Sequence, residues 1–349
     1  MKMTVREDVP LATLTTLRVG GPARYVIDIH TKSELAEAIA FARERTLPYA
    51  VLGEGSNVLA HDAGYEGVIF RMRIPGVSFV EDENVTTLEA GAGVIWDELV
   101  EAAATRGLWG IENLAGIPGT VGAAPVQNIG AYGMELERAL ESVVCMDASD
   151  GTIHTLPRDE CGFSYRDSRF KREPNLIIIA VTLRLGNENM PQVGYSDLAR
   201  LAEGGIPLDT PKRIGDAVRQ VRTRKFPDLA VYGSAGSFFK NPIITKEKYA
   251  ELSERFREVI AQHGAIPQYP LGQTGEIKIP LAYVLDKVLG LRGYGNARAH
   301  LFENQPLVLV ADSEARASDV DTLANEVARK VFDATGITIE REVRNIPSE

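Results

Sequence analysis

Cysteine is scarce in this chain of 349 residues, which contains only Cys145 and Cys161. Two cysteines cannot form a disulfide framework, so we expect a reducing compartment and two thiols that act as small buried apolar side chains. Long apolar runs are missing as well. The first 21 residues hold no stretch long enough for a signal peptide, and nothing later resembles a membrane span. We therefore expect a cytoplasmic protein with no membrane partner.

Several motifs that carry common chemistry are also missing. The five histidines are scattered, without the HxxxH or Cys–His spacing of metal sites, so we expect no metal. Neither the GxSxG of serine hydrolases nor the GxGxxG of dinucleotide-binding loops occurs. The net charge of −10 argues against a protein that coats nucleic acid. What remains is typical of a globular protein of two or three domains.

Hydrophobic periodicity predicts strands mixed with a few helices in the first 190 residues and mainly helices after them. The first part should contain helices over 33–45, capped by Ser33, and 96–104, a hairpin turning at 150–151, and strands over 49–52, 67–71, 85–90 and 176–185. Residues 187–211 are polar and turn-rich, which indicates a junction. After it we expect a helix from Pro211, capped by Thr210, to before Pro227, helices over 247–263, 280–289 and 318–334, and a closing strand over 337–346.

Two glycine-rich loops are the first candidates for ligand binding. The first glycine loop, GEGSNVL at 53–59, follows a predicted strand and could bind phosphate through a nest of backbone amides, although a tight turn is the simpler explanation. The second glycine loop, GIPGTVGAAPVQNIGAYG at 116–133, is long and uncharged. Such a backbone can lie against a flat ring system, and Gln127 and Asn128 add amide groups that could bind it. An irregular buried loop is the less common alternative.

Charged and hydroxyl groups gather in three further places. Arg219, Arg222 and Lys225 recur at helical spacing and would suit a diphosphate, although a solvated helix surface explains them equally well. In GSAGSFFKNP, Ser237 stands between glycine and two phenylalanines, where a tight turn is the simpler explanation. The closing strand should place Glu342 beside Glu340 and Arg344 on one face, for which surface charge pairing is the simpler explanation.

Six segments occur together in a distinctive order: TTLRVGGPA, GEGSNVL, GIPGTVGAAPVQNIGAYG, YRDSRFK, GSAGSFFKNP and EREVR. In this combination the chain resembles the UDP-N-acetylenolpyruvoylglucosamine reductases, flavoenzymes of peptidoglycan precursor synthesis, from about residue 13 to about residue 345. GYSDL at 194–198 resembles the subgroup with a tyrosine loop over the substrate. Ala123 and Ala124 depart from the family, which often has a serine there, so one hydroxyl contact to the flavin is missing.

The resemblance implies an α+β fold of the vanillyl-alcohol-oxidase type, with two α/β subdomains that hold FAD and a third, α+β domain that binds substrate. The first FAD subdomain would cover residues 1–65 and be joined by the C-terminal strand at 336–349. The second would cover 66–190, and the substrate domain 191–335. The last strand would then bring Glu342 close to Ser237.

The resemblance also implies a reaction, the NADPH-dependent and FAD-mediated reduction of UDP-N-acetylglucosamine enolpyruvate to UDP-N-acetylmuramate. Arg166 would stabilise the substrate carboxylate, Glu342 would hydrogen-bond it, and Ser237 would donate a proton. Substrate would be bound by Tyr165, Tyr195, Arg222, Lys225, Asn241 and Gln305. FAD would be bound by Gly53, Gly55, Ser56, Asn57, Val58, Leu59, Ile117, Gly119, Thr120, Gly122, Ala123, Gln127, Asn128, Gly130, Ala131, Tyr132 and Arg344.

Two alternatives stay open at this point. The chain could be another flavoprotein oxidase or dehydrogenase of the same fold, although the glycine loops lack a histidine to which such oxidases attach FAD covalently. It could also be a binding module without turnover, which Arg166, Ser237 and Glu342 argue against. No long exposed apolar helix suggests a partner surface, so we expect a monomer whose partners are the substrate and NADPH.

Overall fold

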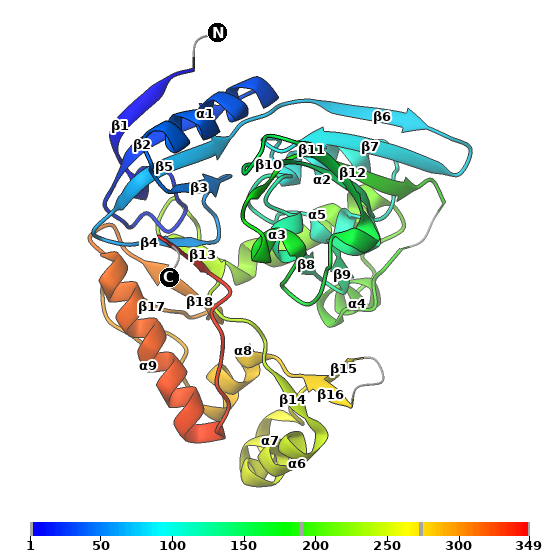
Figure 1. The fold of residues 1–349 in the computed structure, drawn as a ribbon. Coiled ribbons are helices and arrows are strands. Elements are labelled where there is room, and N and C mark those ends of the chain that lie inside the picture. The colour runs from blue at the N-terminus through cyan, green and yellow to red at the C-terminus, as the bar shows by residue number, and fades with distance from the viewer. Residues whose placement is uncertain (1–2, 189–190, 272–274, 348–349) are drawn as a thin grey trace. The chain divides into compact units, whose positions relative to one another are not determined.

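The computed structural model describes residues 3–188, 191–271 and 275–347, which form two compact units (Figure 1). The first contains the chain up to Val9, Pro22–Gly55 and Tyr65–Thr223, and the second contains Pro10–Gly21, Ser56–Gly64 and the chain from Arg224. Each unit mixes helices with sheets, and each has a hydrophobic core of its own. The α+β class is confirmed. The division at residues 65 and 190 into three functional parts stays a prediction.

A four-stranded sheet opens the first unit, in the order β1 (Val5–Pro10), β2 (Pro22–Ile29), β5 (Tyr65–Met72) and β3 (Tyr49–Leu52). Strands β2 and β3 both pair in parallel with β5, and α1 (Lys32–Glu44) packs on the sheet (Figure 1). The α1 residues Leu35, Ala38, Ile39 and Ala42 are buried, which explains the packing. The cap is Thr31, whose hydroxyl accepts from the Glu34 amide, so the prediction of Ser33 was wrong by two residues.

A five-stranded antiparallel sheet follows, ordered β11 (Ile153–Pro157), β10 (Leu140–Asp147), β12 (Leu176–Gly186), β7 (Val85–Gly91) and β6 (Val77–Glu81). The apolar run of β12 lies in its centre, as a buried strand should, and β10 and β11 form the hairpin predicted at 150–151. Smaller elements of this unit are α2 (Trp96–Thr105), β8 (Gly130–Ala131), β9 (Met134–Glu135), α3 (Arg169–Arg172), α4 (Ser196–Glu203) and α5 (Pro211–Lys225), with short turns η2 (Glu112–Leu114), η3 (Pro125–Gln127), η4 (Leu136–Arg138) and η5 (Arg158–Glu160).

Helix α5 begins as the sequence predicts. The Thr210 carbonyl accepts from the Ile214 amide at 3.1 Å, and its hydroxyl accepts from the Arg213 amide at 3.2 Å. The apolar stripe of α5 is buried, which leaves its arginines on the flanks. Helix α4 was not predicted, because it lies in a segment whose polar, glycine-rich composition is typical of a junction.

The second unit is built on β13 (Gly233–Ser237), β18 (Gln305–Ala311) and β17 (Ala299–Phe302), which pack with α9 (Ala317–Thr335) (Figure 1). A smaller sheet joins β14 (Ile243–Thr245), β16 (Glu276–Lys278) and β15 (Tyr269–Leu271). Strand β4 (Val58–Ala60) pairs in parallel with β19 (Arg344–Ile346). The remaining elements are η1 (Leu11–Thr13), α6 (Lys246–Arg255), α7 (Arg257–His263), α8 (Leu281–Tyr283) and the π-turn η6 (Val284–Val288).

Three predicted elements of this unit differ from the structure. The helix expected over 247–263 is interrupted at Phe256, and the one over 280–289 is split between α8 and η6. The closing strand is confined to residues 344–346. Before it, the amides of Glu342 and Val343 both point to the Phe238 carbonyl, at 2.8 and 3.5 Å. When two successive amides point to one acceptor, side chains no longer alternate between the two faces of a strand. Glu342 and Val343 are therefore both buried.

The two cysteines are fully buried and unpaired. Burial raises the pKa of Cys145 to about 11 and that of Cys161 to about 12, so both thiols stay neutral and behave as apolar side chains, as predicted. Within residues 3–188, 191–271 and 275–347, no helix combines the length and apolar character that a membrane crossing requires. The same residues contain no group of three or more metal-ligating side chains.

Candidate active site

The two glycine loops meet in the first unit at Gly53 and Thr120. A Cβ atom at Gly53 would lie 2.5 Å from Thr120 Oγ1, so only glycine fits there. Gly55 and Gly119 have φ values of +65° and +123°, which other residues rarely adopt. Thr120 is 2% exposed, and its hydroxyl has no hydrogen-bond partner among the residues described. A buried hydroxyl without a hydrogen-bond partner lowers the stability of the fold, so this glycine-lined site fits a polar ligand that would supply the partner.

The second glycine loop is held from two helices at its first residue. The Gly116 amide donates to Asp97 Oδ1 of α2 at 2.6 Å, and Arg222 Nε of α5 donates to the Gly116 carbonyl at 2.8 Å. Gly116 itself has a φ of +68°. Burial lowers the pKa of Arg222, whose guanidinium nevertheless stays charged. Arg222, predicted to bind substrate, thus also holds the loop predicted to bind FAD.

Further along this loop, protein contacts use some of the groups that we predicted to face the flavin. Asn128 is fully buried, its Oδ1 accepts from the Glu137 amide at 3.1 Å, and its Nδ2 donates to the Ser164 carbonyl at 3.4 Å. A Cβ atom at Gly122 would lie 2.6 Å from that of Ala92, so this glycine is required by packing inside the protein. The loop therefore has a fixed shape of its own.

Arg166, predicted to hold the substrate carboxylate, lies against the second glycine loop. Its Nη2 donates to the Gly130 carbonyl at 2.8 Å, and its guanidinium lies 5.3 Å from the Tyr165 ring centre. The Ser168 hydroxyl donates to the Val126 carbonyl at 2.7 Å, which fastens the turn that carries Arg166 to the same loop. Arg166 has a φ of +55°, an uncommon conformation for arginine that is often found at functional sites.

The basic face predicted on α5 is only partly present. Arg219 Nε donates to both carboxylate oxygens of Asp97, at 3.1 and 3.0 Å, and Arg219 Nη1 lies 2.7 Å from Glu101 and 3.3 Å from Asp216. These three carboxylates compensate the charge of Arg219, and an anion-binding role for it stays a prediction. Lys225 lies at the C-terminal end of the same helix and is half-buried.

Tyr195, predicted to cover the substrate, packs against the second glycine loop. Its ring meets that of Tyr132 edge-on, with 5.4 Å between the ring centres, and 36% of Tyr195 is exposed. Burial raises the pKa of Tyr132 to about 12, so this phenol stays neutral. Tyr132 also has a φ of +48°. The predicted flavin loop and the predicted tyrosine loop are therefore in direct contact.

In the second unit, Ser237 ends β13 at an irregular pairing with β18. The following residues, Phe238 and Phe239, are buried and anchor the turn in the core. The Phe238 carbonyl accepts from the Glu342 amide at 2.8 Å, which places Glu342 beside the residue that follows Ser237. Glu342 is 8% exposed, so the alternative of a surface charge pair is wrong for it.

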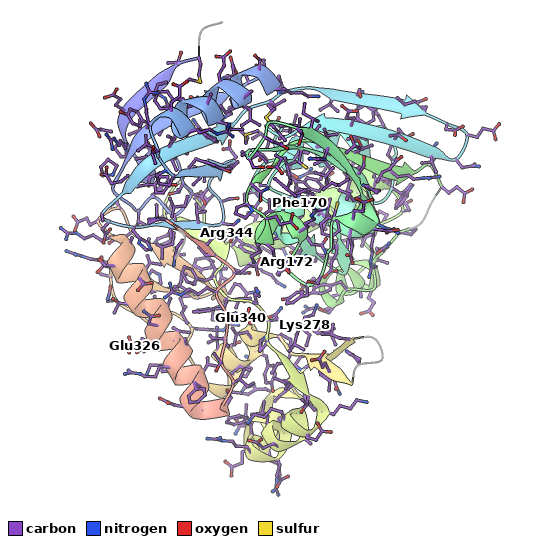
Figure 2. The ribbon with its side chains drawn as sticks, viewed as in Figure 1. Phe170, Arg172, Lys278, Glu326, Glu340 and Arg344 are labelled. Carbon is purple, nitrogen blue, oxygen red and sulfur yellow. The ribbon has the colours of Figure 1, made fainter. Side chains whose placement is uncertain are left out.

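The first glycine loop continues into this unit and reaches the same segment. Asn57 Nδ2 donates to the Glu342 carbonyl at 3.2 Å, and the Asn57 carbonyl accepts from the Arg344 amide at 3.1 Å. Pairing of β4 with β19 then sets Arg344 opposite Val58. Burial lowers the pKa of Arg344, which lies near the end of the C-terminal segment that also carries Glu340 (Figure 2). Ser237, Glu342, Asn57 and Arg344 therefore come from adjoining backbone segments.

Other predicted residues of this unit have structural contacts. Asn241 Oδ1 accepts from the Leu281 amide at 2.9 Å and so caps α8, and Gln305 begins β18. A Cβ atom at Gly233 would lie 2.1 Å from the Leu17 carbonyl oxygen, so this glycine permits a close approach within the protein. Lys240 forms an exposed pair with Glu340 at 2.7 Å.

Our sequence interpretation missed Asp97 and Asn113. Asp97 looks like an ordinary acidic residue at a helix start, and only its contacts with Gly116 and Arg219 reveal its place. Asn113 is 2% exposed and donates to two loop carbonyls. The available signal for Asn113 was an amide inside the otherwise apolar run that leads to the second glycine loop. Of the predicted catalytic residues, Arg166 belongs to the first unit, and Ser237 and Glu342 belong to the second.

The glycine-lined place around Thr120 and the fixed second glycine loop are typical of a protein that holds a large cofactor, and residues 23–157 match the family of FAD binding domains. The fold is therefore the predicted vanillyl-alcohol-oxidase type, and the protein is a flavin-binding oxidoreductase. Residues 228–346 match the UDP-N-acetylenolpyruvoylglucosamine reductase C-terminal domain. The chain belongs to the UDP-N-acetylenolpyruvoylglucosamine reductase family.

Individual relatives align over nearly the whole chain. The reductase of Pseudomonas aeruginosa is 36% identical over 345 residues, which are 98% of this chain and 99% of that protein. That of Salmonella typhi is 38% identical over 326 residues, which are 93% and 92% of the two chains. The crystal structure of UDP-N-acetylenolpyruvylglucosamine reductase from Thermus caldophilus superimposes with a TM-score of 0.65 at 27% identity, covering 98% of this chain and 99% of that one.

Proposed function

We propose that this chain catalyses the NADPH-dependent, FAD-mediated reduction of UDP-N-acetylglucosamine enolpyruvate to UDP-N-acetylmuramate in peptidoglycan precursor synthesis. Membership of the reductase family supports the reaction. The observation that supports the assignment of residues is the bond between the Glu342 amide and the Phe238 carbonyl, because Phe238 directly follows Ser237 in the chain. The same proposal has the protein act as a monomer in the cytoplasm.

The residues present fit FAD. Thr120 offers a buried hydroxyl that none of the described residues bonds, and Gly53 provides the space beside it. Gly55 and Gly119 give the backbone conformations that allow main-chain amides to converge on an anion. Arg344, which is half-buried in the second unit, is the basic residue that the family resemblance assigns to FAD. When bound, FAD would accept a hydride from NADPH and deliver one to the methylene carbon of the enolpyruvyl group.

Arg166 then acts on the substrate carboxylate. Negative charge develops on the carbon next to that carboxylate as the methylene carbon gains hydride, and a planar guanidinium stabilises the charge where it spreads into the carboxylate. Its bond to the Gly130 carbonyl uses one of five N–H donors and fixes the orientation of the others. The second glycine loop thus aligns the group that neutralises the substrate.

Ser237 and Glu342 complete the reaction from the second unit. Ser237 donates the proton that the charged carbon requires, and solvent returns a proton to the hydroxyl. A serine is a weak acid, so this role needs a strongly basic acceptor, which the carbanion-like carbon provides. Glu342 hydrogen-bonds the substrate carboxylate in its protonated form. Glu342 is 8% exposed, so its carboxyl group lies largely out of contact with bulk solvent.

The test separates the two half-reactions by anaerobic stopped-flow absorbance. We expect NADPH to bleach the bound flavin of Ser237→Ala within about threefold of the wild-type rate, while recovery of colour with the enolpyruvyl substrate slows by about 10²- to 10⁴-fold. Equal slowing of both halves in a variant that retains FAD would contradict the proton-donor role. Bleaching by NADPH with no recovery in the wild type would favour a protein without this turnover.

Ser234→Ala is the matched control. Ser234 lies on the same strand, but its hydroxyl donates to the Leu309 carbonyl at 3.1 Å inside the sheet and accepts from the Gly236 amide at 3.2 Å. We expect this variant to lose about 1 kcal/mol of stability, because it leaves a buried acceptor without its partner, and to keep both half-reaction rates. The two serines therefore separate a structural hydroxyl from a reacting one.

A further inference from the structure

Asn113 stands on a rigid turn that is anchored on both sides. Before it, Glu112 Oε2 accepts from the Gly110 amide at 2.6 Å. After it, the Leu114 carbonyl accepts from Trp96 Nε1 of α2 at 3.0 Å. All three residues of the turn, Glu112 to Leu114, are buried. The position of the Asn113 side chain is thus set by the core of the first unit and not by the loops that it contacts.

From this position the Asn113 amide reaches two different loops. Its Nδ2 donates to the Tyr132 carbonyl at 2.9 Å, at the end of the second glycine loop. The same nitrogen donates to the Gln192 carbonyl at 2.8 Å, in the tyrosine loop, which we define as residues 191–198. Both hydrogens of the amide nitrogen are therefore used, one for each loop. Next to this bridge, the rings of Tyr132 and Tyr195 meet edge-on.

The two loops do not depend on Asn113 equally. The second glycine loop is also fastened at Gly116, at Asn128 and by the pairing of β8 with β9. In the tyrosine loop, the bond at Gln192 lies three residues before Tyr195, which occupies the N-cap position of α4, and Leu198 of α4 is fully buried in the core. A loss of the Asn113 donors should therefore loosen the residues around Tyr195 more than the glycine loop.

We propose that Asn113 is a positioning residue that fixes the tyrosine loop on the flavin-binding loop, so that Tyr195 is held ready to cover the sugar nucleotide. The inference rests on the proposed function, because it assumes that Tyr195 contacts substrate. Asn113 acts through Tyr195 and touches neither substrate nor reacting atoms. Its removal should therefore affect substrate binding and leave the reduction of flavin by NADPH intact.

The first experiment uses the holoenzyme without substrate, so it does not depend on the proposed reaction. Asn113→Asp keeps the shape of the side chain but replaces two donors with oxygens that repel the two carbonyls. We expect amide hydrogen exchange in residues 193–199 to become about 10- to 100-fold faster, from the loss of two buried hydrogen bonds. Unchanged exchange in a folded variant would overturn the proposal. If Asn113→Asp does not fold, Asn113→Ala serves for the same measurement.

The second experiment measures steady-state and half-reaction kinetics. We expect Asn113→Asp to raise KM for the enolpyruvyl substrate by about 10- to 100-fold, with flavin reduction within about threefold of wild type. Tyr195→Ala should raise KM alone but add little in the Asn113→Asp background, because both changes remove the same contact. Additive effects would show that Asn113 acts independently of Tyr195 and would overturn the proposal.

Asn187→Asp is the matched control, since Asn187 also donates its amide to a backbone carbonyl, that of Asp82 between β6 and β7. It should change neither exchange in the tyrosine loop nor KM. If amide hydrogen exchange becomes faster in Asn113→Asp but the wild type shows no turnover, the proposed function is contradicted. The connection between the two loops through Asn113 is still supported. The two ideas can therefore fail separately.

Discussion

We predict that the hydroxyl of Thr120 contacts the flavin cofactor. It is buried, and none of the described residues bonds it, whereas most buried polar groups in proteins are satisfied. We expect Thr120→Val to stabilise the apoprotein by about 1 kcal/mol, because a buried polar group without a partner is removed. The same change should weaken FAD binding about 3- to 10-fold through the lost hydrogen bond. Thermal unfolding of apoprotein and fluorescence titration with FAD measure the two effects.

Thr15→Val provides the comparison for this prediction. The Thr15 hydroxyl is also buried without a hydrogen-bond partner among the described residues, but it lies outside both glycine loops. Its replacement should give a similar gain in apoprotein stability and leave FAD affinity unchanged. Equal losses of FAD affinity in the two variants would contradict a specific role of Thr120.

Single residues differ in how far the sequence predicts them. Arg166, Ser237 and Glu342 could be proposed because they occur within distinctive motifs, and their catalytic roles stay predictions. Asn113 and Asp97 could not, because their partners are backbone groups that lie far away in the sequence. The sequence pattern shows which residue types stand at which positions. Contacts between a side chain and a distant backbone group can be seen only once the fold is known.

Between elements, Asp97 connects helices α2 and α5 to the second glycine loop. Its carboxylate accepts from the Gly116 amide and from Arg219, and Arg222 completes the contact at the Gly116 carbonyl. We expect Asp97→Asn to weaken FAD binding about 10-fold, because a hydrogen bond to a charged group is replaced by one to a neutral amide and the start of the loop loses its fixed orientation. Titration of the apoprotein with FAD measures this effect.

Two neighbouring carboxylates serve as controls for Asp97. Asp216 also pairs with Arg219, and Glu98 is exposed on the same helix as Asp97. Asp216→Asn and Glu98→Gln should both leave FAD affinity within about twofold, as exposed ion pairs contribute little. If Asp216→Asn weakens FAD binding as much as Asp97→Asn does, FAD affinity depends on the charge balance around Arg219 and not on the contact between Asp97 and Gly116.

Elements with a strong periodic pattern were predicted well, since their own residues decide them. Helices α1, α2, α5 and α9 and strand β12 lie where hydrophobic spacing placed them. The closing strand was wrong over its first part because the Phe238 carbonyl, more than 100 residues away, sets the direction of the Glu342 and Val343 amides. Short strands such as β13 were missed for a similar reason, since a partner strand and not their glycine-rich sequence makes them strands.

The whole molecule has two cores that are discontinuous in sequence, because the second unit takes Pro10–Gly21 and Ser56–Gly64 from the N-terminal part of the chain. Periodicity alone could not show this, since each of these segments is short and local pattern carries no information about which distant core it joins. Both tryptophans, Trp96 and Trp109, and both cysteines belong to the first unit. Fluorescence and thiol labelling therefore report on that unit alone.

This distribution allows the independence of the two cores to be tested in the full-length apoprotein. Leu183 and Leu309 are fully buried in the first and the second core, and truncation of either to alanine should cost about 2–5 kcal/mol. We expect Leu183→Ala to lower the urea midpoint seen by tryptophan fluorescence. Leu309→Ala should leave the fluorescence midpoint unchanged, because no tryptophan lies in the second unit. It should instead lower the urea midpoint of the second unit, which only far-UV circular dichroism detects.

Thiol labelling at pH 8 gives a second measure of the first unit. The raised pKa values of Cys145 and Cys161 keep both thiols protonated well above this pH in the folded protein, and both are buried, so labelling requires unfolding of their unit. Leu183→Ala should accelerate labelling, and Leu309→Ala should not. If Leu309→Ala accelerates labelling and shifts the fluorescence midpoint as much as Leu183→Ala does, the apoprotein unfolds as one cooperative body and the two cores are not independent.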